Sequence, residues 1–443
     1  MVPSPRTRAA ERFGLPRPVW FLGWVSLATD AASEAIYPLL PFFLTQVLGA
    51  GAVSLGIVEG AAEAANSVLK ILSGRLADRS RAKRPIVIAG YALSSAVRPL
   101  IALAQNWMHV FTVRLVDRIG KGIRGAPRDA MLATWAMPTT RGKVYGFHRA
   151  MDHAGAVVGP AVASLFLWFY PGEYRTLFAL TIIPGAIAVL LIFFVREEEV
   201  KPGYVGSAFP GAPKPHSGER GSRTVGPSAA PGSPKPLSGE AGRPTVPAVP
   251  NRGDVEPLPR QFKLFMVVLT LFMLGNSTDA FLLLKLTDVA GGVQFVPLMW
   301  SALHIVKATV SIIGGSWSDR VGRRAVIAIG WLVYAAVYAG FAISSSLIAL
   351  LAWFLLYGFY FGFAEGTEKA LVADLAPPSR RGFAFGVYTA VQGLGALTAS
   401  VVFGVIWSAA GPAVAFAFGA ALALVATALL FVVIPSEPAI VRT

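Results

Sequence analysis

Cysteine is absent from this chain of 443 residues, and charged residues are scarce. Without a thiol there can be no disulfide and no thiolate metal site. Asp, Glu, Lys and Arg make up 14% of the residues, whereas a soluble globular protein carries roughly a quarter. Hydrophobic residues make up 54% of the chain. This balance argues against a soluble domain and favours a protein embedded in lipid.

Several motifs of catalysis and targeting are missing as well. No Gly-x-x-x-x-Gly-Lys-Ser/Thr loop is present, so ATP is not bound by that route. His148 and His153 are five positions apart, which is not the His-x-x-x-His spacing of a metal site. No short apolar region with a small-residue cleavage site follows the basic segment 1–17, so we expect no signal peptide. We therefore expect no enzyme activity, no cofactor and no resident metal ion.

What the chain has in abundance is apolar runs of about 20 residues, the length that crosses a bilayer as a helix. Twelve spans are predicted, at residues 18–45, 54–75, 86–105, 108–134, 143–170, 174–195, 261–288, 294–317, 325–344, 347–373, 382–409 and 411–434. The predicted fold class is an all-α integral membrane protein. Its twelve transmembrane helices would form two pseudo-symmetric six-helix halves around a central cavity.

The formal net charge of +15 is concentrated in alternate connections between these spans. Arg and Lys occur in the N-terminal tail and in the second, fourth, eighth and tenth connections, while the intervening ones are nearly bare. Cytoplasmic loops of membrane proteins carry this excess. We therefore expect a multi-pass protein of the cell's inner (plasma) membrane with both termini in the cytoplasm. The positive charge then reflects topology and does not indicate a nucleic-acid partner.

One long segment interrupts the pattern of spans. Residues 196–260 are rich in Pro, Gly and Ser and cannot bury enough apolar surface to become ordered. The predicted domains are a cytoplasmic tail at 1–17, a first half at 18–195, a disordered cytoplasmic linker at 196–260, a second half at 261–434 and a cytoplasmic tail at 435–443. A docking role for the linker remains an alternative.

The two halves repeat each other in sequence. The segment around Asp78 matches the segment around Asp319, 241 positions later. Arg141 in "TTRGKVYGF" matches Arg381 in "SRRGFAFGV", 240 positions later. A duplicated six-span unit whose copies move about a site between them is typical of a secondary transporter.

On these motifs the sequence resembles the major facilitator superfamily over all twelve spans. The family has a Gly-x-Leu-Ala-Asp-Arg-x-Gly-Arg-Arg-type motif between its second and third helices. The resemblance implies a cytoplasmic gating latch, in which an Asp caps a neighbouring helix and pairs with basic residues. The matching residues, with their counterparts in the second half, are Gly74, Asp78, Arg79, Arg84, Gly315, Asp319, Arg320 and Arg323.

Two further motifs of that family are partly present. Arg118 and Gly122 match an Arg-x-x-Gln-Gly motif of the fourth helix, with Lys121 in place of Gln. Gly155, Gly159 and Pro160 match the start of a fifth-helix motif that the family's antiporters carry. The resemblance therefore favours export. The stretch "DRIGKGIRGAPRDA" is similar to that of an unassigned subfamily, which gives no substrate.

The fourth span carries the most unusual feature, five cations in the nineteen residues "RLVDRIGKGIRGAPRDAML". They are Arg114, Arg118, Lys121, Arg124 and Arg128. At about 100° per residue they lie on one stripe about 120° wide. Three or four charges facing lipid would cost on the order of 10 kcal/mol, which would prevent a stable span. The stripe must therefore face the interior of the bundle or a wet cavity.

Acids on other spans can meet this stripe, and the candidates for substrate binding or proton coupling follow from both sets. They are Asp30, Glu34, Glu63, Arg118, Lys121, Arg124, Asp152, His153, Asp279 and Glu365. Because buried charge is costly, such groups are functional candidates by default. We expect protein carboxylates to hold Arg118 and the solute to meet Lys121 and Arg124. The alternative is an internal salt-bridge network with a structural role alone.

The predicted function is secondary active transport of a small, anionic or partly anionic solute by alternating access. Acids flanked by cations can bind and release protons as a cavity opens and closes, so we expect proton coupling. The expected partners are a small-molecule substrate, protons and the lipid bilayer, with the protein a monomer. Proton-driven export competes with proton-coupled uptake of an organic anion, and a distant alternative is a membrane sensor that transports nothing.

Overall fold

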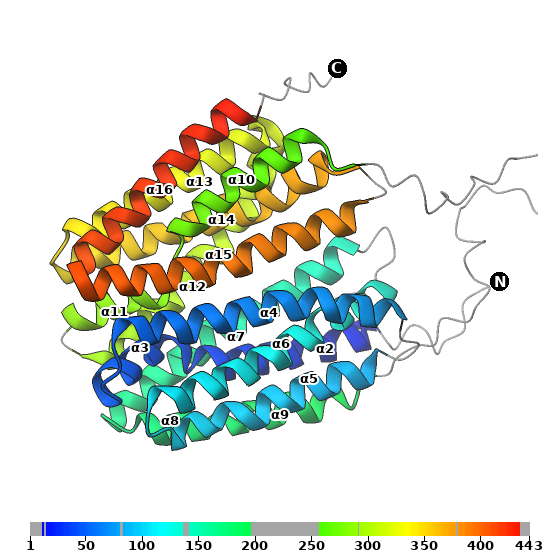
Figure 1. Cartoon of the computed structure of the whole chain (residues 1–443). Helices are drawn as coiled ribbons and strands as arrows, with labels where there is room; N and C mark the ends of the chain where they lie inside the picture. Colours follow the sequence, from blue (N-terminus) through cyan, green and yellow to red (C-terminus); the bar gives the residue numbers. More distant parts are fainter. Residues whose placement is uncertain are drawn as a thin grey trace, which may run out of the picture. The chain divides into compact units, whose positions relative to one another are not determined.

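The computed structural model describes residues 11–12, 15–79, 83–135, 141–195, 257–290, 292–377 and 380–434, which are almost wholly helical (Figure 1). The first half contains β1 (Glu11–Arg12), β2 (Leu15–Pro16), α2 (Arg17–Glu34), η1 (Tyr37–Leu39), α3 (Leu40–Phe42), η2 (Phe43–Val47), α4 (Ala52–Arg79), α5 (Arg84–Val97), η3 (Arg98–Leu103), α6 (Trp107–Trp135), α7 (Arg141–Phe169), α8 (Tyr174–Leu180) and α9 (Ile182–Ile192). The predicted linker, except its last four residues, and the predicted C-terminal tail lie outside the described residues.

The second half is also helical. It contains α10 (Arg260–Gly275), α11 (Ala280–Val289), η4 (Val293–Phe295), α12 (Val296–Val321), α13 (Arg323–Ile343), α14 (Leu347–Leu375), α15 (Arg381–Ala410) and α16 (Pro412–Val433). Within the described part of the chain, nine helical segments are long and apolar enough to cross a membrane. The other three predicted spans coincide with α2, α4 and α6, whose ionisable residues lower their hydropathy. The all-α membrane fold is thus confirmed.

Three of the predicted spans are divided into separate helical segments, and a fourth, 86–105, passes from α5 into the 3₁₀ helix η3. Pro38 and Pro41 follow the end of α2, and proline cannot donate the hydrogen bond that continues a helix. Pro184 has the same effect between α8 and α9. The third break, at residues 276–279, separates α10 from α11 without a proline. There Tyr334 donates to the Gly275 carbonyl (2.8 Å) and the Thr278 amide donates to Ser400 Oγ (3.1 Å), so freed backbone groups have partners.

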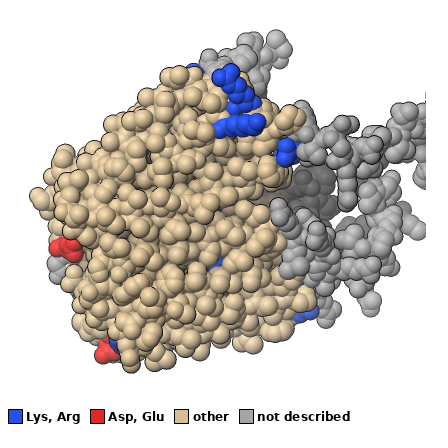
Figure 2. Space-filling model, viewed as in Figure 1, with Lys and Arg blue, Asp and Glu red and all other residues tan. Residues whose placement is uncertain are grey.

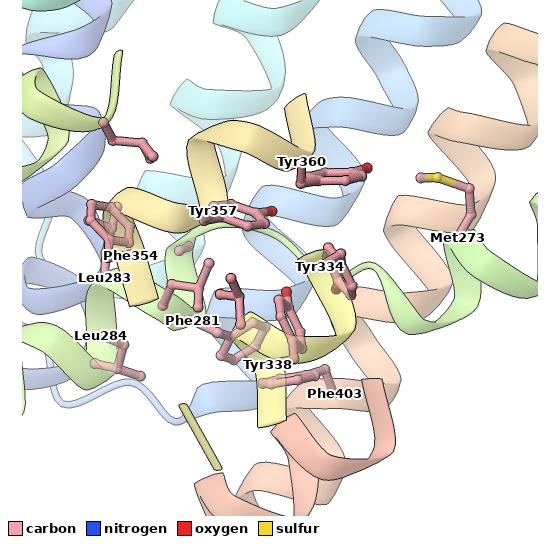
Figure 3. Packing of buried hydrophobic residues seen from close by; sticks show 14 of the residues in the cluster. Met273, Phe281, Leu283, Leu284, Tyr334, Tyr338, Phe354, Tyr357, Tyr360 and Phe403 are labelled. Carbon is pink, nitrogen blue, oxygen red and sulfur yellow. The ribbon is translucent and has the colours of Figure 1, made fainter. Parts of the chain in front are cut away.

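Buried aromatic rings fill the interior of the second half (Figure 3). Phe272 stacks on Trp331 at 4.4 Å between ring centroids, and Tyr334 stacks on Tyr338 at 4.1 Å. The face in Figure 2 is nearly free of charge, with most visible Lys and Arg at its right-hand end and the few visible Asp and Glu at its left-hand end. An apolar surface between two polar ends suits a protein that spans a bilayer.

The two halves meet where α4 packs along α15 and α7 packs along α12 (Figure 1). Glycines allow the α4–α15 contact to be close. A β-carbon on Gly60 would lie 2.9 Å from the Leu397 Cα atom, and one on Gly404 would lie 2.7 Å from the Ala52 carbonyl oxygen. Side chains larger than hydrogen would therefore separate these helices.

This contact does not extend along the whole of α15. We use "basic end" for the end of the bundle where α4, α6 and α12 end and where α5, α7, α13 and α15 begin. There Gly382 and Gly386 have nothing within 4 Å of where a β-carbon would lie. A mouth of about 840 Å³ opens there between α15 and helices α4 and α6. The halves are therefore in contact at the opposite end and apart at the basic end.

Gly159→Ala is expected to destabilise the first half by about 1–3 kcal/mol, the usual cost of overpacking. Its new methyl group would collide with the backbone of Ala31 in α2, which cannot move as a side chain can. The matched control is Gly146→Ala on the same helix, where the β-carbon would meet nothing within 4 Å. That change should be neutral or stabilising by up to about 1 kcal/mol. Thermal unfolding of the purified variants measures both, and equal melting temperatures would contradict the prediction.

Candidate functional site

A cavity of about 320 Å³ lies between the two halves, and we call it the central cavity. Residues of α2, α4 and α6 face it from the first half. Residues of α12, α14, α15 and the break between α10 and α11 face it from the second. The ionisable side chains on its wall include Glu34, Glu59, Glu63, Arg118, Asp279, His304 and Lys307. Its size is at the lower end of the range for small-molecule sites.

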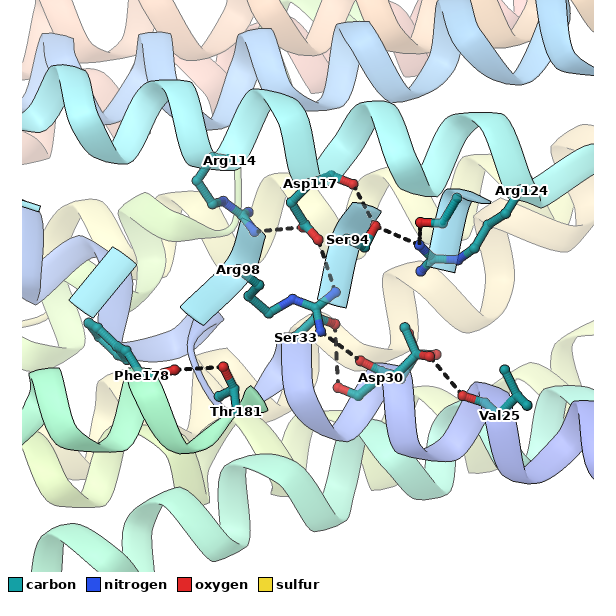
Figure 4. A network of polar contacts seen from close by, with 12 residues as sticks. Val25, Asp30, Ser33, Ser94, Arg98, Arg114, Asp117, Arg124, Phe178 and Thr181 are labelled. Atoms are coloured by element: carbon teal, nitrogen blue, oxygen red, sulfur yellow. Dashed lines mark hydrogen bonds and ion pairs between the residues drawn. The ribbon is translucent and has the colours of Figure 1, made fainter. Parts of the chain in front are cut away.

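The stripe of cations predicted for the fourth span lies on α6. Its first member, Arg114, is neutralised by protein carboxylates (Figure 4). Arg114 donates from Nε (2.9 Å) and Nη2 (2.6 Å) to the two oxygens of Glu59. Arg98 of η3 forms an ion pair with Asp117 at 2.9 Å, and the Asp117 carboxylate lies 3.9 Å from the Arg114 guanidinium. All four side chains are buried. Paired and hydrogen-bonded charges of this kind can be tolerated inside a membrane protein.

Arg124 is also fixed, but by neutral groups of α5 (Figure 4). Its Nη1 donates to Ser94 Oγ at 2.7 Å and approaches the Gly90 carbonyl at 3.5 Å. Its guanidinium carbon lies 4.4 Å from the centre of the Tyr91 ring, within the range of a cation–π interaction. The contacts of Arg124 therefore tie α6 to α5.

Arg118 differs from its neighbours on the stripe. It is only 7% exposed and lines the central cavity. Within the described residues it makes no hydrogen bond through its side chain and no ion pair within 4 Å. A guanidinium has five N–H donors, and leaving it buried without a partner is costly. Arg118 is thus available to an anionic group that enters the cavity.

The acids of the central cavity fall into two kinds. Asp279 lies 3.4 Å from the Lys307 ammonium and accepts a hydrogen bond from Tyr357 at 2.7 Å. Within the described residues, Glu34 accepts only from Trp300 Nε1 (2.9 Å) across the interface between halves, and Glu63 only from Asn66 (3.2 Å). Among the described residues, neither of these two has a cation within 4 Å. The cavity therefore holds unpaired charges of both signs.

Two histidines face each other across the interface, His153 from α7 and His304 from α12. Their ring centroids are 6.5 Å apart, and His304 packs edge-on against Trp300 at 5.0 Å. Both ring nitrogens of His304 are buried without a hydrogen-bond partner in the described part of the protein. If the halves separate here, water can form hydrogen bonds with these two nitrogens.

A second cavity of about 330 Å³ lies toward the basic end, and we call it the basic-end cavity. Its charged residues include Asp30, Lys70, Lys121, Arg124, Arg128, Asp129, Arg149, Asp152, Glu365 and Lys369. Asp152 accepts from Ser26 and lies 3.5 Å from His148, and Glu365 pairs with Lys369 at 2.8 Å. The carboxylate of Asp30 and the ammonium of Lys121 have no ion pair within 4 Å among the described residues.

The gating motif can be followed only in part. Gly74 lines the mouth, Arg84 donates to the Phe193 carbonyl at 2.7 Å, and Arg323 pairs with Asp374 at 3.2 Å. Arg320 is exposed. The side chains of Asp78, Arg79 and Asp319, and the surroundings of Gly315, lie outside the described part of the structure. The latch therefore stays a prediction.

The antiporter-like motif has a packing role in this structure. β-Carbons on Gly155 and Gly159 would collide with backbone atoms of Leu27 and Ala31 in α2. Pro160 follows inside α7 and is buried. These residues thus set the close approach of α2 and α7.

Nine of the ten residues predicted for binding or coupling line the two cavities. Glu34, Glu63, Arg118 and Asp279 face the central cavity, and Asp30, Lys121, Arg124, Asp152 and Glu365 face the basic-end cavity. His153 lies at the interface beside His304. The predicted set of site residues did not include Arg98, Trp300 or Glu368. A lone Arg followed by Pro in an apolar run was a signal for Arg98, whereas the roles of Trp300 and Glu368 depend on partners remote in sequence.

Comparisons with known proteins agree with this architecture. The sequence profile of the Major Facilitator Superfamily matches residues 19–291 and 261–442. A protein of Methanocaldococcus jannaschii, described as an uncharacterized MFS-type transporter, is 30% identical over 422 residues, 94% of each chain. The multidrug resistance protein MdtH of Aeromonas hydrophila is 28% identical over 183 residues, which cover 41% of this chain and 46% of that one.

The fold is also that of solved transporters. The nucleoside transporter NupG superposes with a TM-score of 0.72 at 13% identity, covering 95% of this chain and 100% of that one. A bacterial homologue of the human lysosomal transporter Spinster gives a TM-score of 0.67 at 14% identity, with 97% and 98% covered. The chain is a multi-pass membrane protein that belongs to the major facilitator superfamily.

Proposed function

We propose that this protein is a proton-coupled exporter of a small solute that carries an anionic group. The observation that carries the proposal is Arg118, a buried cation that lacks a protein partner among the described residues and faces a cavity between the two halves. A carboxylate or phosphate bound there would satisfy the guanidinium with charge-assisted hydrogen bonds.

The unpaired acids of the same cavity narrow the solute further. Glu34 and Glu63 have hydrogen-bond donors but no cation within 4 Å in the part of the chain described here. A solute that also carries a positive group would balance them, and so would bound protons. A small zwitterion therefore fits this cavity better than a simple anion.

Alternating access is supported by the asymmetry of the α4–α15 contact. The helices touch through Gly60 and Gly404, and they part at the mouth near Gly382. If the basic end faces the cytoplasm, as the positive-inside rule predicts, this is a conformation open to the cytoplasm. We place the protein in the inner membrane as a monomer with both termini in the cytoplasm.

Proton coupling is assigned to Asp30 and Asp152, which line the basic-end cavity. Asp30 has no ion pair within 4 Å among the described residues, and Lys121 lines the same cavity. A carboxylate whose surroundings change as the cavity opens and closes can take up a proton in one state and release it in the other. The partial likeness to the multidrug resistance protein MdtH supports export over uptake.

The test uses the purified protein in liposomes that contain a pH-sensitive dye. Members of a panel of small carboxylates, amino acids and phosphates are added under an imposed pH step. We expect at least one to move proton equivalents in the direction opposite to its own flux, and Asp30→Asn to abolish this coupling while solute exchange continues. Movement of solute and protons in the same direction would indicate uptake by symport. Solute flux without proton movement would overturn the proposed coupling.

A further inference from the structure

One buried acid lies outside both cavities and has no part in the mechanism above. Glu368 is on α14, is 3% exposed, and points between α13 and α15. Glu365 and Lys369 on the same helix pair with each other at 2.8 Å on the side of the basic-end cavity. Glu368 is therefore separated from the nearest cation of its own helix.

Neutral groups hold the two oxygens of Glu368. Trp331 Nε1 of α13 donates to Oε1 at 2.9 Å, and the Tyr388 hydroxyl of α15 donates to Oε2 at 3.0 Å. The Gln392 side chain donates to the Tyr388 oxygen at 2.8 Å. No cation lies within 4 Å of Glu368 in the described ranges. Besides Tyr388, the titratable groups close enough to feel its charge are Glu365, Lys369 and Tyr360.

These contacts leave the carboxyl group balanced between two states. As an anion it keeps two hydrogen bonds but carries a buried charge without an ion pair within 4 Å among the described residues, which is costly inside a bilayer protein. As a neutral acid it avoids that cost, but its O–H needs an acceptor. The Tyr388 oxygen can provide one by turning its own proton away, so the same residues can serve both states.

The hydrogen-bonded chain also leads toward water. Gln392 precedes Gly393, whose β-carbon position is 2.5 Å from Ser67 of α4 at the contact between the halves. Thr389 and Ala390, on the same stretch of α15, line the mouth at the basic end. The chain from Glu368 through Tyr388 to Gln392 therefore runs from the interior of the second half to the surface that opens and closes.

We propose that Glu368 is a proton-binding site of the second half and that Tyr388 carries the proton to and from it. In uptake, a hydronium ion that enters from the mouth gives a proton to the Tyr388 oxygen and leaves as water, while the Tyr388 hydroxyl proton passes to Oε2 of Glu368. One O–H bond breaks and one forms at each step, and no other reactant is needed. Gln392 positions the hydroxyl. The inference rests on the proposed proton coupling and gives the second half a proton site beside Asp30 and Asp152 in the first.

The test is infrared spectroscopy of the purified full-length protein, which needs no substrate. As the pH is stepped across the range in which the protein stays folded, we expect several carboxylic-acid carbonyl bands to appear and disappear, one of them from Glu368. Glu368→Gln should remove that band, whereas the matched control Glu365→Gln should keep it. Tyr388→Phe should keep the band but slow its response to a pH jump by about 100-fold, the scale of a lost proton-transfer group.

Melting temperatures test whether the variants are folded. We expect Glu368→Gln to fold, because the glutamine side-chain oxygen can still accept the hydrogen bond from Trp331. An unchanged set of bands in Glu368→Gln, or no titrating band in the parent protein, would overturn the proposal for Glu368. An unchanged rate in Tyr388→Phe would overturn the path. Failure of the proposed function has a different signature, since solute flux without proton movement could coexist with a titrating Glu368.

Discussion

Arg118→Gln is expected to weaken solute binding by about 100-fold while leaving the melting temperature of the free protein nearly unchanged. A charge-assisted hydrogen bond contributes about 1.5–3 kcal/mol, and Arg118 has donors for more than one. Since no carboxylate of the described residues lies within 4 Å of it, the substitution strands no buried acid. Binding is measured as the rise in melting temperature with the solute that the liposome assay identifies.

The matched control is Arg124→Gln, six residues further along the same helix. Arg124 bonds to Ser94 and lies over the Tyr91 ring, so its loss should lower the melting temperature. Solute binding should change less than in Arg118→Gln. Arg118 is not the solute-binding cation if Arg118→Gln binds solute as tightly as the parent protein. The same holds if Arg118→Gln lowers the melting temperature while Arg124→Gln weakens solute binding.

Glu59→Gln is expected to have the largest effect on stability, a loss of about 3–5 kcal/mol. It would leave Arg114 buried without its bidentate partner. Asp117 cannot substitute, because it is already bonded to Arg98 and lies 3.9 Å from Arg114. Thermal unfolding in detergent measures the loss.

Glu63→Gln provides the control for this second prediction. Glu63 is on the same helix one turn later and lines the same cavity, but its only hydrogen-bond partner among the described residues is Asn66. Its neutralisation should change stability by less than about 1 kcal/mol. Replacing Glu59 and Arg114 together by Leu and Met should recover much of the loss, as it does for other buried pairs. Equal melting temperatures for the two single variants would show that the Arg114–Glu59 pair is not a stability element.

The course of the helices could be predicted because lipid imposes a simple rule on each span, namely length and apolar composition. The breaks at Pro38 and Pro184 follow from local chemistry that is visible in sequence. The break at residues 276–279 does not, because its freed backbone groups are satisfied by Tyr334 and Ser400 from other helices. Only the folded arrangement shows that such an interruption has partners.

In the candidate site, too, local features could be predicted from the sequence, whereas contacts between helices could not. The face of α6 that carries the cations was predictable from helical spacing, and these cations do face the interior. Their partners were not. The sequence favoured protein carboxylates around Arg118 and a solute beside Arg124, whereas the contacts favour the reverse. Asp117 pairs with Arg98, and Arg124 donates a hydrogen bond to Ser94. Arg118 is therefore left facing the cavity.

The acids of α14 illustrate why spacing alone is insufficient. Residues at i, i+3 and i+4 are neighbours on a helix, so spacing alone would place Glu365, Glu368 and Lys369 on one face. Yet i and i+3 differ by about 60° around the axis. That rotation is enough to put Glu365 on a cavity and Glu368 between Trp331 and Tyr388.

The hydrogen bond from Trp300 to Glu34 makes the protein suited to optical study. An indole is fluorescent, and its emission depends on the polarity and charge around it. Trp300 lies against Tyr37 and within 5.0 Å of the Lys307 ammonium, and the Glu34 carboxylate it contacts belongs to the other half. Separation of the halves would replace this buried, charged environment by water. A version of the protein that keeps Trp300 and replaces the other nine tryptophans by phenylalanine would therefore report its conformational changes in real time, without an added label.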